Sequence, residues 1–261
     1  MDILLTNDDS HASPLFRFAI DILKPLGHVT IVVPKEEQSW TGKSMSRFKP
    51  LVLDEIRLQQ EDRAYCLDGT PADCANVGVY HACKRRPELV VSGINIGVNA
   101  GVSFFFASGT IGACLEANIA GVPAVALSQA LEREVFRTWL EHRQMPKEAV
   151  ARLCEQTVTL LDRVFHQLFA REDFLSKPVT WNVNLPYTAA PDWDIVPTVL
   201  GHTMYGSCFN KVGNQFRHGL ELPTPDNRNN ADGEVLQRGD VSVTCIDIRT
   251  FAQTPIPLKR Q

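Results

Sequence analysis

Several signals that mark secreted, zinc-binding or membrane-spanning proteins are missing from this sequence. Its 261 residues include seven cysteines but no C-x-x-C pair, and its seven histidines show no H-x-x-x-H or H-E-x-x-H spacing. These absences argue against a disulfide framework, a zinc ribbon and a histidine-rich metal site. The N-terminus does not resemble a signal peptide, and no uncharged apolar stretch reaches the roughly 18 residues that a membrane span needs. We therefore expect a cytoplasmic protein with reduced thiols and no membrane role.

Basic residues are also in short supply. The chain has 26 Lys and Arg against 30 Asp and Glu, so its formal net charge is -4. Proteins that bind nucleic-acid polymers usually carry a basic excess, so we expect no such partner, whereas a small anionic substrate needs only local donors. The phosphate-loop pattern, the dinucleotide-binding fingerprint and the G-x-S-x-G motif are absent as well. Their absence disfavours two common nucleotide-binding motifs and a serine hydrolase.

The apolar residues that are present predict an α/β fold. Short apolar runs without alternation are typical of strands buried on both faces of a parallel sheet. They occur at residues 2–6, 29–33, 89–91, 122–127 and 179–185, and helical patterns separate them at 14–25, 108–120 and 147–170. Strands alternating with helices indicate a mostly parallel sheet in a core of residues 1–186. After it, clustered Pro, Gly and Asn predict a β-rich C-terminal extension, 187–261, that packs on the core or on a partner subunit.

Two adjacent carboxylates follow the first predicted strand. Asn7, Asp8 and Asp9 come directly after the buried run of residues 2–6. Neighbouring like charges raise the cost of ionising each other, so a bound cation explains the pair most simply. A turn followed by a helix N-cap is the alternative, because Asn and Asp are frequent in both.

Polar loops also follow two other predicted strands. One holds residues 36–39, which end in Ser39, and the other holds residues 92–99, which include Asn95 and Asn99. Loops at the carboxyl ends of parallel strands share one edge of the sheet, where ligands bind. Their oxygens suit Mg²⁺, Mn²⁺ or Ca²⁺. The second segment could also be merely a glycine-rich connection.

Ser108, Gly109 and Thr110 begin a predicted helix. A helix N-terminus presents free N–H groups and a positive dipole end, which together can bind phosphate. Taken alone, Ser108 could be only a cap and Gly109 only a packing residue. Their position after the polar loop favours the phosphate site.

Assembled, these motifs resemble the survival-protein (SurE) family of divalent-metal-dependent nucleotidases. The resemblance rests on residues 4–9 (LLTNDD), the loop with Gln38, Ser39, Gly42 and Ser44, residues 69–74 (GTPADC), and residues 92–99 (SGINIGVN) with 108–110 (SGT). Their order and spacing agree over about residues 1–128, with a fainter echo at 181–186.

The resemblance implies a Rossmann-like three-layer fold and a phosphomonoesterase that hydrolyses nucleoside 5′- or 3′-monophosphates. One divalent ion per subunit, Mg²⁺ or Mn²⁺, would be held by Asp8, Asp9, Ser39 and Asn95. The phosphate would be held by Asn99, Ser108, Gly109 and Thr110. Asp8 or Asp9 could also act in catalysis by orienting or deprotonating the attacking water. A homodimer or homotetramer that exchanges C-terminal strands is implied too.

Two departures from the family pattern bear on the site. Ser10 stands where the family has glycine, so a backbone conformation that suits glycine would be strained here. Phe104, Phe105 and Phe106 replace an acidic, polar stretch, and could stack a base, seal a subunit contact or fill the core. These departures keep a rival open, a non-catalytic module that binds a nucleotide or phosphate on the same fold.

Overall fold

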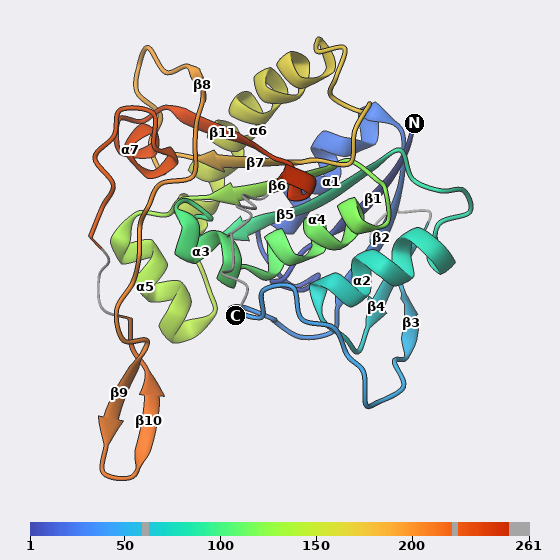
Figure 1. Cartoon of the computed structure of the whole chain (residues 1–261), viewed down its shortest axis with the longest axis horizontal. Helices are drawn as coiled ribbons and strands as arrows, with labels where there is room; N and C mark the ends of the chain where they lie inside the picture. Colours follow the sequence, from blue (N-terminus) through green and yellow to red (C-terminus); the bar gives the residue numbers. More distant parts are fainter. Residues whose placement is uncertain (59–62, 221–223, 251–261) are drawn as a thin grey trace, which may run out of the picture.

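The first strand, β1 (Asp2–Thr6), lies in the middle of a twisted sheet in the computed structural model, which describes residues 1–58, 63–220 and 224–250 (Figure 1). In this described part, nine strands follow the order β3-β4-β2-β1-β5-β6-β7-β11-β8. The other members are β2 (His28–Pro34), β3 (Leu53–Ile56), β4 (Ala64–Leu67), β5 (Leu89–Ile96), β6 (Ala124–Gln129), β7 (Thr180–Leu185), β8 (Ile195–Pro197) and β11 (Val241–Ile246).

The sheet is mostly parallel, as the sequence predicts. Neighbouring strands from β4 through β2, β1, β5 and β6 to β7 all pair in parallel. β3 pairs antiparallel with β4 at one edge, and β11 pairs antiparallel with β7 near the other. β8 then adds to β11 in parallel. Residues of the predicted C-terminal extension therefore continue the core sheet, although residues 221–223 and 251–261 of that extension lie outside the described part.

Helices cover both faces of the sheet and complete three layers. They are α1 (Phe16–Leu23), α2 (Pro71–Val77), α3 (Val102–Ala107), α4 (Gly109–Ile119), α5 (Arg133–His142), α6 (Lys147–Phe169) and α7 (Asp232–Gln237), with the shorter η1 (Lys24–Leu26), η2 (Gly78–Ala82) and η3 (Ile248–Thr250). Alternate side chains of β1 point to opposite faces: Ile3 and Leu5 pack in the core shared with α1 and α6, and Leu4 packs with α2 and α4. Among the described helices, none is both long and apolar enough to cross a bilayer.

The start of α2 shows how local sequence sets an element boundary. The Thr70 hydroxyl accepts the Asp73 amide at 3.1 Å, and the Asp73 carboxylate accepts the Thr70 amide at 2.9 Å. This capping box, with Pro71 in the first turn, fixes the start of α2.

Several elements differ from the predicted ones. β5 runs on to Ile96 through a register shift between Ser92 and Asn95, so Asn95 lies within a strand end rather than in a loop. The charged stretch after β6 forms α5, of which only Trp139 is buried. The hairpin of β9 (Phe209–Val212) and β10 (Gln215–His218) is exposed along its whole length and extends away from the rest of the chain (Figure 1).

Candidate active site

The candidate site lies where the direction of the sheet's strand order reverses. β1 is flanked by β2, which follows it in the chain, and by β5, which comes later on the other side. Ligands of open α/β sheets bind at such a position, beyond the carboxyl ends of the strands. Thr6 at the end of β1 is in register with Ser92 of β5, and the Gln38 amide after β2 donates to the Asp8 carbonyl at 2.8 Å. The three loops predicted to meet therefore do meet.

A tight turn directs the two carboxylates. The Asn7 side-chain amide donates to the Ser10 carbonyl at 2.7 Å, and the Ser10 hydroxyl accepts the Ala12 amide at 3.3 Å. Ser10 has φ of +64°, the left-handed conformation that favours glycine. The strain expected from replacing the family's glycine is thus present. Within this turn Asp8 and Asp9 are both buried.

Asp8 is held by the first turn of α4. The Thr110 hydroxyl donates to Asp8 Oδ1 at 2.6 Å. Burial raises the pKa of Asp8 to about 6, and hydrogen bonds from the Thr110 side chain and backbone offset part of the rise. A Cβ at Gly109 would lie 3.0 Å from the Asp8 Cβ and 3.0 Å from the Gln38 carbonyl oxygen. Glycine at 109 therefore lets the helix start approach Asp8 closely.

Asp9 is held by the strand on the other side. Its Oδ2 accepts the Ile96 amide of β5 at 3.0 Å. Burial, and next the charge of Asp8, raise the pKa of Asp9 well above its usual range, while the Ile96 amide and Arg143 lower it. Two buried carboxylates that repel each other form an unfavourable arrangement that a divalent cation would relieve.

The donor atoms near this pair fit a hard divalent cation. Asn7 Oδ1 is buried and accepts no hydrogen bond from the residues that the structure describes. In the same residues no group of three or more His, Cys, Asp or Glu side chains could hold a metal. An ion bound at Asp8 and Asp9 would therefore be completed by neutral oxygens, which the surrounding Asn and Ser residues offer.

The other two predicted metal ligands are less closely joined to the pair. Ser39 is exposed, and its hydroxyl donates to Glu37 Oε1 at 2.7 Å. Asn95 is half-buried at the end of β5, in register with Ser128 of β6. The backbone bond from Gln38 brings the Ser39 loop to Asp8, yet the Ser39 hydroxyl is engaged by Glu37 in this structure.

Glu37 and Arg143 were not among the predicted site residues. Arg143, which follows α5 at a φ of +53°, pairs with Glu37 at 3.1 Å. Glu37 contributes to the raised pKa of both Asp8 and Asp9. Its position in a loop after a parallel strand could have identified Glu37 as a site residue from the sequence. No local pattern connects Arg143 to the site, because α5 is distant in sequence.

The predicted phosphate residues divide into two groups. Ser108 caps α4, its hydroxyl accepting the Ile111 amide at 3.2 Å, so that Ser108, Gly109 and Thr110 form the helix start beside Asp8. Asn99 is buried farther along the edge, where its side-chain amide donates to Ser128 at 2.8 Å. Its backbone amide donates to Asn184 of β7 at 2.7 Å.

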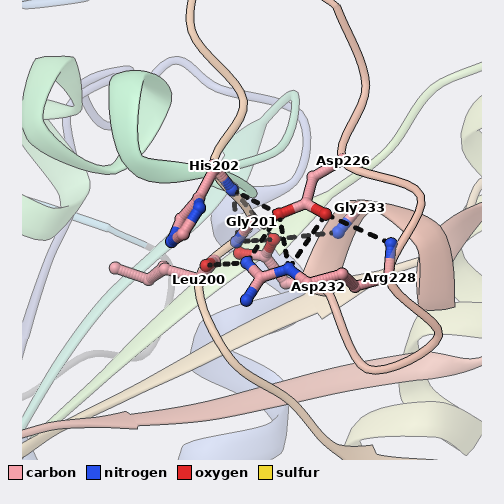
Figure 2. Close-up of polar contacts among 8 residues, drawn as sticks. Leu200, Gly201, His202, Asp226, Arg228, Asp232 and Gly233 are labelled. Atoms are coloured by element: carbon pink, nitrogen blue, oxygen red, sulfur yellow. Dashed lines mark hydrogen bonds and ion pairs between the residues drawn. The ribbon is translucent and has the colours of Figure 1, made fainter.

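A buried carboxylate anchors the segment between Asn99 and Ser108. Asp232 at the start of α7 accepts the Gly101 amide at 2.9 Å. It accepts the Gly201 amide at 2.9 Å as well (Figure 2). It also accepts the adjacent Gly233 amide. Burial raises the pKa of Asp232, although these amides oppose the rise. The sequence alone did not indicate this residue, because two of its three donors come from distant segments and the third is its own neighbour.

An open cavity of about 430 Å³ lies nearby but is separate from the predicted site. It is lined by His202, Met204 and residues 224–228, and contains none of the predicted metal or phosphate residues. On its wall the Asp226 carboxylate accepts the His202 amide and pairs with Arg228, as Figure 2 shows. Asp226 is satisfied by these groups, so the cavity offers no comparable unpaired charge.

Comparison with known proteins shows the family of this chain. Residues 3–207 match the family model described as "Survival protein SurE". A relative from Methanocella arvoryzae, named 5'-nucleotidase SurE, is 38% identical over 207 residues, which are 78% of this chain and 73% of the relative. Another of that name, from Methanothrix thermoacetophila, is 31% identical over 257 residues, covering 96% and 94% of the two chains.

A solved structure shows the same fold. The crystal structure of the SurE protein from Aquifex aeolicus aligns with a TM-score of 0.70 at 23% identity, over 95% of this chain and 94% of that one. The predicted α/β fold is thereby confirmed, and so is the resemblance first seen in residues 4–9 and 92–110. This chain belongs to the survival protein SurE family.

Proposed function

We propose that this chain is a 5′-nucleotidase, a divalent-metal-dependent phosphomonoesterase that hydrolyses nucleoside 5′-monophosphates, and 3′-monophosphates as well, to nucleoside and phosphate. The family membership and the name of its relatives, 5'-nucleotidase SurE, support this activity. The observation that carries it is the buried pair Asp8–Asp9, which lies against the N-terminus of α4. An anion-binding helix start beside a cation-binding pair suits phosphate ester hydrolysis.

Asp8, Asp9, Ser39 and Asn95 are the proposed ligands of one Mg²⁺ or Mn²⁺ ion per subunit. When bound, the ion supplies Lewis acidity and lowers the pKa of a coordinated water. Asp8 or Asp9 orients the attacking water or accepts its proton. Thr110 and the Ile96 amide keep the two carboxylates in fixed orientations during this step.

The proposed phosphate ligands act as fixed dipoles. Ser108, Gly109 and Thr110 place the positive end of the α4 dipole beside the carboxylate pair, where charge on the phosphoryl oxygens is stabilised. Asn99 lies farther along the same edge and is itself held by Ser128 and Asn184. Because these groups are preorganised by the fold, little rearrangement accompanies the reaction.

The C-terminal extension, residues 187–261, is proposed to join subunits of a homodimer or homotetramer in the cytoplasm. The exposed apolar side chains of the β9–β10 hairpin support this: Phe209 and Phe216 are 57% and 64% exposed in the single chain. Surfaces of this kind commonly mark protein contacts.

A phosphate-release screen tests the proposal. The protein is assayed with 5′- and 3′-monophosphates of the four common nucleosides in Mg²⁺, Mn²⁺ or EDTA, beside Asp9→Asn. We expect activity that depends on the metal and falls at least ~10²-fold in the variant. A thermal shift on metal addition provides a readout without turnover. Nucleotide binding without phosphate release would favour the non-catalytic rival, and activity that survives complete metal removal would contradict the metal requirement.

A further inference from the structure

Four aromatic rings from three separate segments meet beside the candidate site. The Trp40 ring lies 6.2 Å from Phe104, 5.4 Å from Tyr205 and 4.9 Å from His218, measured between centroids. Phe104 also contacts Tyr205 at 5.6 Å. We call this group the aromatic platform. Among its residues, only Phe104 stood out in the sequence, as part of the run of three Phe residues. The other rings belong to residues far from Phe104 along the chain.

We propose that the aromatic platform binds the nucleobase of the substrate by stacking, and that it favours purines over pyrimidines. The proposal rests on the proposed nucleotidase function and assigns the part of the site that recognises the base. Of the three consecutive Phe residues, only Phe104 joins the platform: Phe105 is buried in the core and Phe106 packs against Phe105.

Backbone hydrogen bonds attach the platform to both halves of the candidate site. Trp40 follows Ser39 in a loop that is tied on one side by Gln38 to Asp8 and on the other by the Gly42 amide to the Ala107 carbonyl at 2.9 Å. The Phe104 carbonyl accepts the Ser108 amide at 3.1 Å. One helical turn of backbone, about 5.4 Å of rise, therefore separates Phe104 from Ser108 at the proposed phosphate site. A ribose can span this separation.

The conformation of Trp40 points to a role beyond packing. Its φ is +63°, in the left-handed region that bulky residues rarely adopt. Strained residues of this kind concentrate at ligand-binding positions. The Trp40 side chain remains 42% exposed, so part of the indole surface is open to a planar ligand. The rings of Phe104 and His218 are inclined to the indole plane by 69° and 63°, so neither is stacked parallel on it.

Stacking explains the expected preference for purines over pyrimidines. Every base has a π-face, so an aromatic surface binds all of them, and the two-ring purines cover more of the indole than pyrimidines do. This contribution belongs to binding of the ground state and the transition state alike, so its loss raises KM more than it lowers kcat.

The decisive measurement uses adenosine, which has no phosphate and requires no turnover. Calorimetry of adenosine binding is compared between the wild type, Trp40→Ala, Trp40→Phe and the matched control Tyr80→Ala, in which the exposed Tyr80 of η2 is removed. We expect Trp40→Ala to weaken adenosine binding about 10- to 100-fold, Trp40→Phe to retain most of it and Tyr80→Ala to be unchanged. In the phosphatase assay, Trp40→Ala should raise KM for AMP by a similar factor and should change KM for ribose 5-phosphate, which has no base, by a smaller factor.

Circular dichroism and a thermal unfolding midpoint show that each variant is folded, and Phe104→Leu offers a milder second change. If wild type and Trp40→Ala bind adenosine equally, the platform is not a base site, even where nucleotide hydrolysis is confirmed. If adenosine binding depends on Trp40 but no phosphate is released from any ester, the base site stands and the nucleotidase function fails. A change of oligomeric state in Trp40→Ala with unaltered adenosine affinity would instead make the platform a subunit contact and overturn the proposal.

Discussion

The carboxylates of Asp8 and Asp9 are buried together at the centre of the sheet edge, with hydrogen bonds that orient them without neutralising their charge. Arg143 reduces the electrostatic cost at Asp9 but is already paired with Glu37. The pair thus lowers the stability of the metal-free protein at the proposed cation site, and such a conflict is frequent at functional sites.

Replacing Asp9 by Asn should therefore stabilise the metal-free protein. Removing one of two repelling charges should raise its stability by about 1–2 kcal/mol, or roughly 2–8 °C in Tm for a chain of this size. The variant should also lose the Tm increase that Mg²⁺ or Mn²⁺ gives the wild type. Scanning calorimetry with and without the ion measures both effects.

Asp173→Asn is the matched control, because exposed Asp173 pairs with Arg171 at 2.9 Å far from the site. It should not raise the Tm of the metal-free protein and should keep the response to metal. A metal-free Asp9→Asn protein less stable than wild type would show that the pair is not under electrostatic strain.

The left-handed turn at Ser10 leads to a second expectation. Ser10→Gly should be more stable than Ser10→Ala by about 1 kcal/mol, since glycine adopts positive φ without a Cβ clash. Both variants lose the hydrogen bond that the Ser10 hydroxyl accepts from Ala12, so their difference isolates the backbone. Urea denaturation of the two variants provides the comparison, and equal stabilities would refute backbone strain at this position.

Among the elements, α4 matters most for the proposed chemistry, because the residues at its start both cap the helix and hold Asp8. Ser108 fulfils the cap and Thr110 donates to the carboxylate. Thr110→Val keeps the shape of the side chain but removes that donor. We expect kcat to fall about 10-fold, since a hydrogen bond to a charged group is worth roughly 1.5–3 kcal/mol.

Thr110→Ser retains the hydroxyl and should remain close to wild type in the same phosphate-release assay. If the Val and Ser variants turned over substrate at equal rates, Thr110 would not position Asp8.

Asp232 shows how one buried side chain joins separate elements. Its carboxylate connects Gly101, ahead of α3, with Gly201, after β8. Asp232→Asn replaces an acceptor oxygen by an NH₂ donor facing amides, and should lower stability by about 2–3 kcal/mol in urea denaturation. An unchanged midpoint would mean that these amides find other acceptors.

The pH dependence of this variant has a definite sign. Burial raises the folded-state pKa of Asp232 above its unfolded value. Stability from this group is therefore full below the unfolded pKa and decreases as the pH rises through the folded one. The advantage of wild type over Asp232→Asn should be larger near pH 4 than at pH 7, and the reverse trend would contradict the assigned direction.

At the level of the whole molecule, packing within a single chain gives no reason for the exposed apolar side chains of the β9–β10 hairpin. Phe216 is 64% exposed and Val212 is 58% exposed. Changing both to Ser should shift the proposed dimer or tetramer toward smaller species in light scattering, because an apolar contact is lost. Phe48→Ser, which alters a 94% exposed side chain outside the hairpin, should leave the assembly unchanged. An identical mass for the hairpin variant and wild type would exclude the hairpin as a contact.

Local patterns in the sequence determined a large part of this protein. The apolar run of residues 2–6 became β1, the TPAD sequence became a capping box and Ser108 became the cap of α4. These features depend on residues at most a few positions apart, so periodicity and capping chemistry predict them. The sequence itself also places Asp8 and Asp9 next to each other.

Only the tertiary structure decided which distant groups meet. Glu37 is turned toward Arg143, Asp232 reaches Gly101, and Trp40 meets Tyr205. Each of these contacts joins segments that no local pattern relates, since they depend on the packing of whole elements around the sheet. Burial, and with it the raised pKa of both carboxylates, is a property of the assembled fold for the same reason.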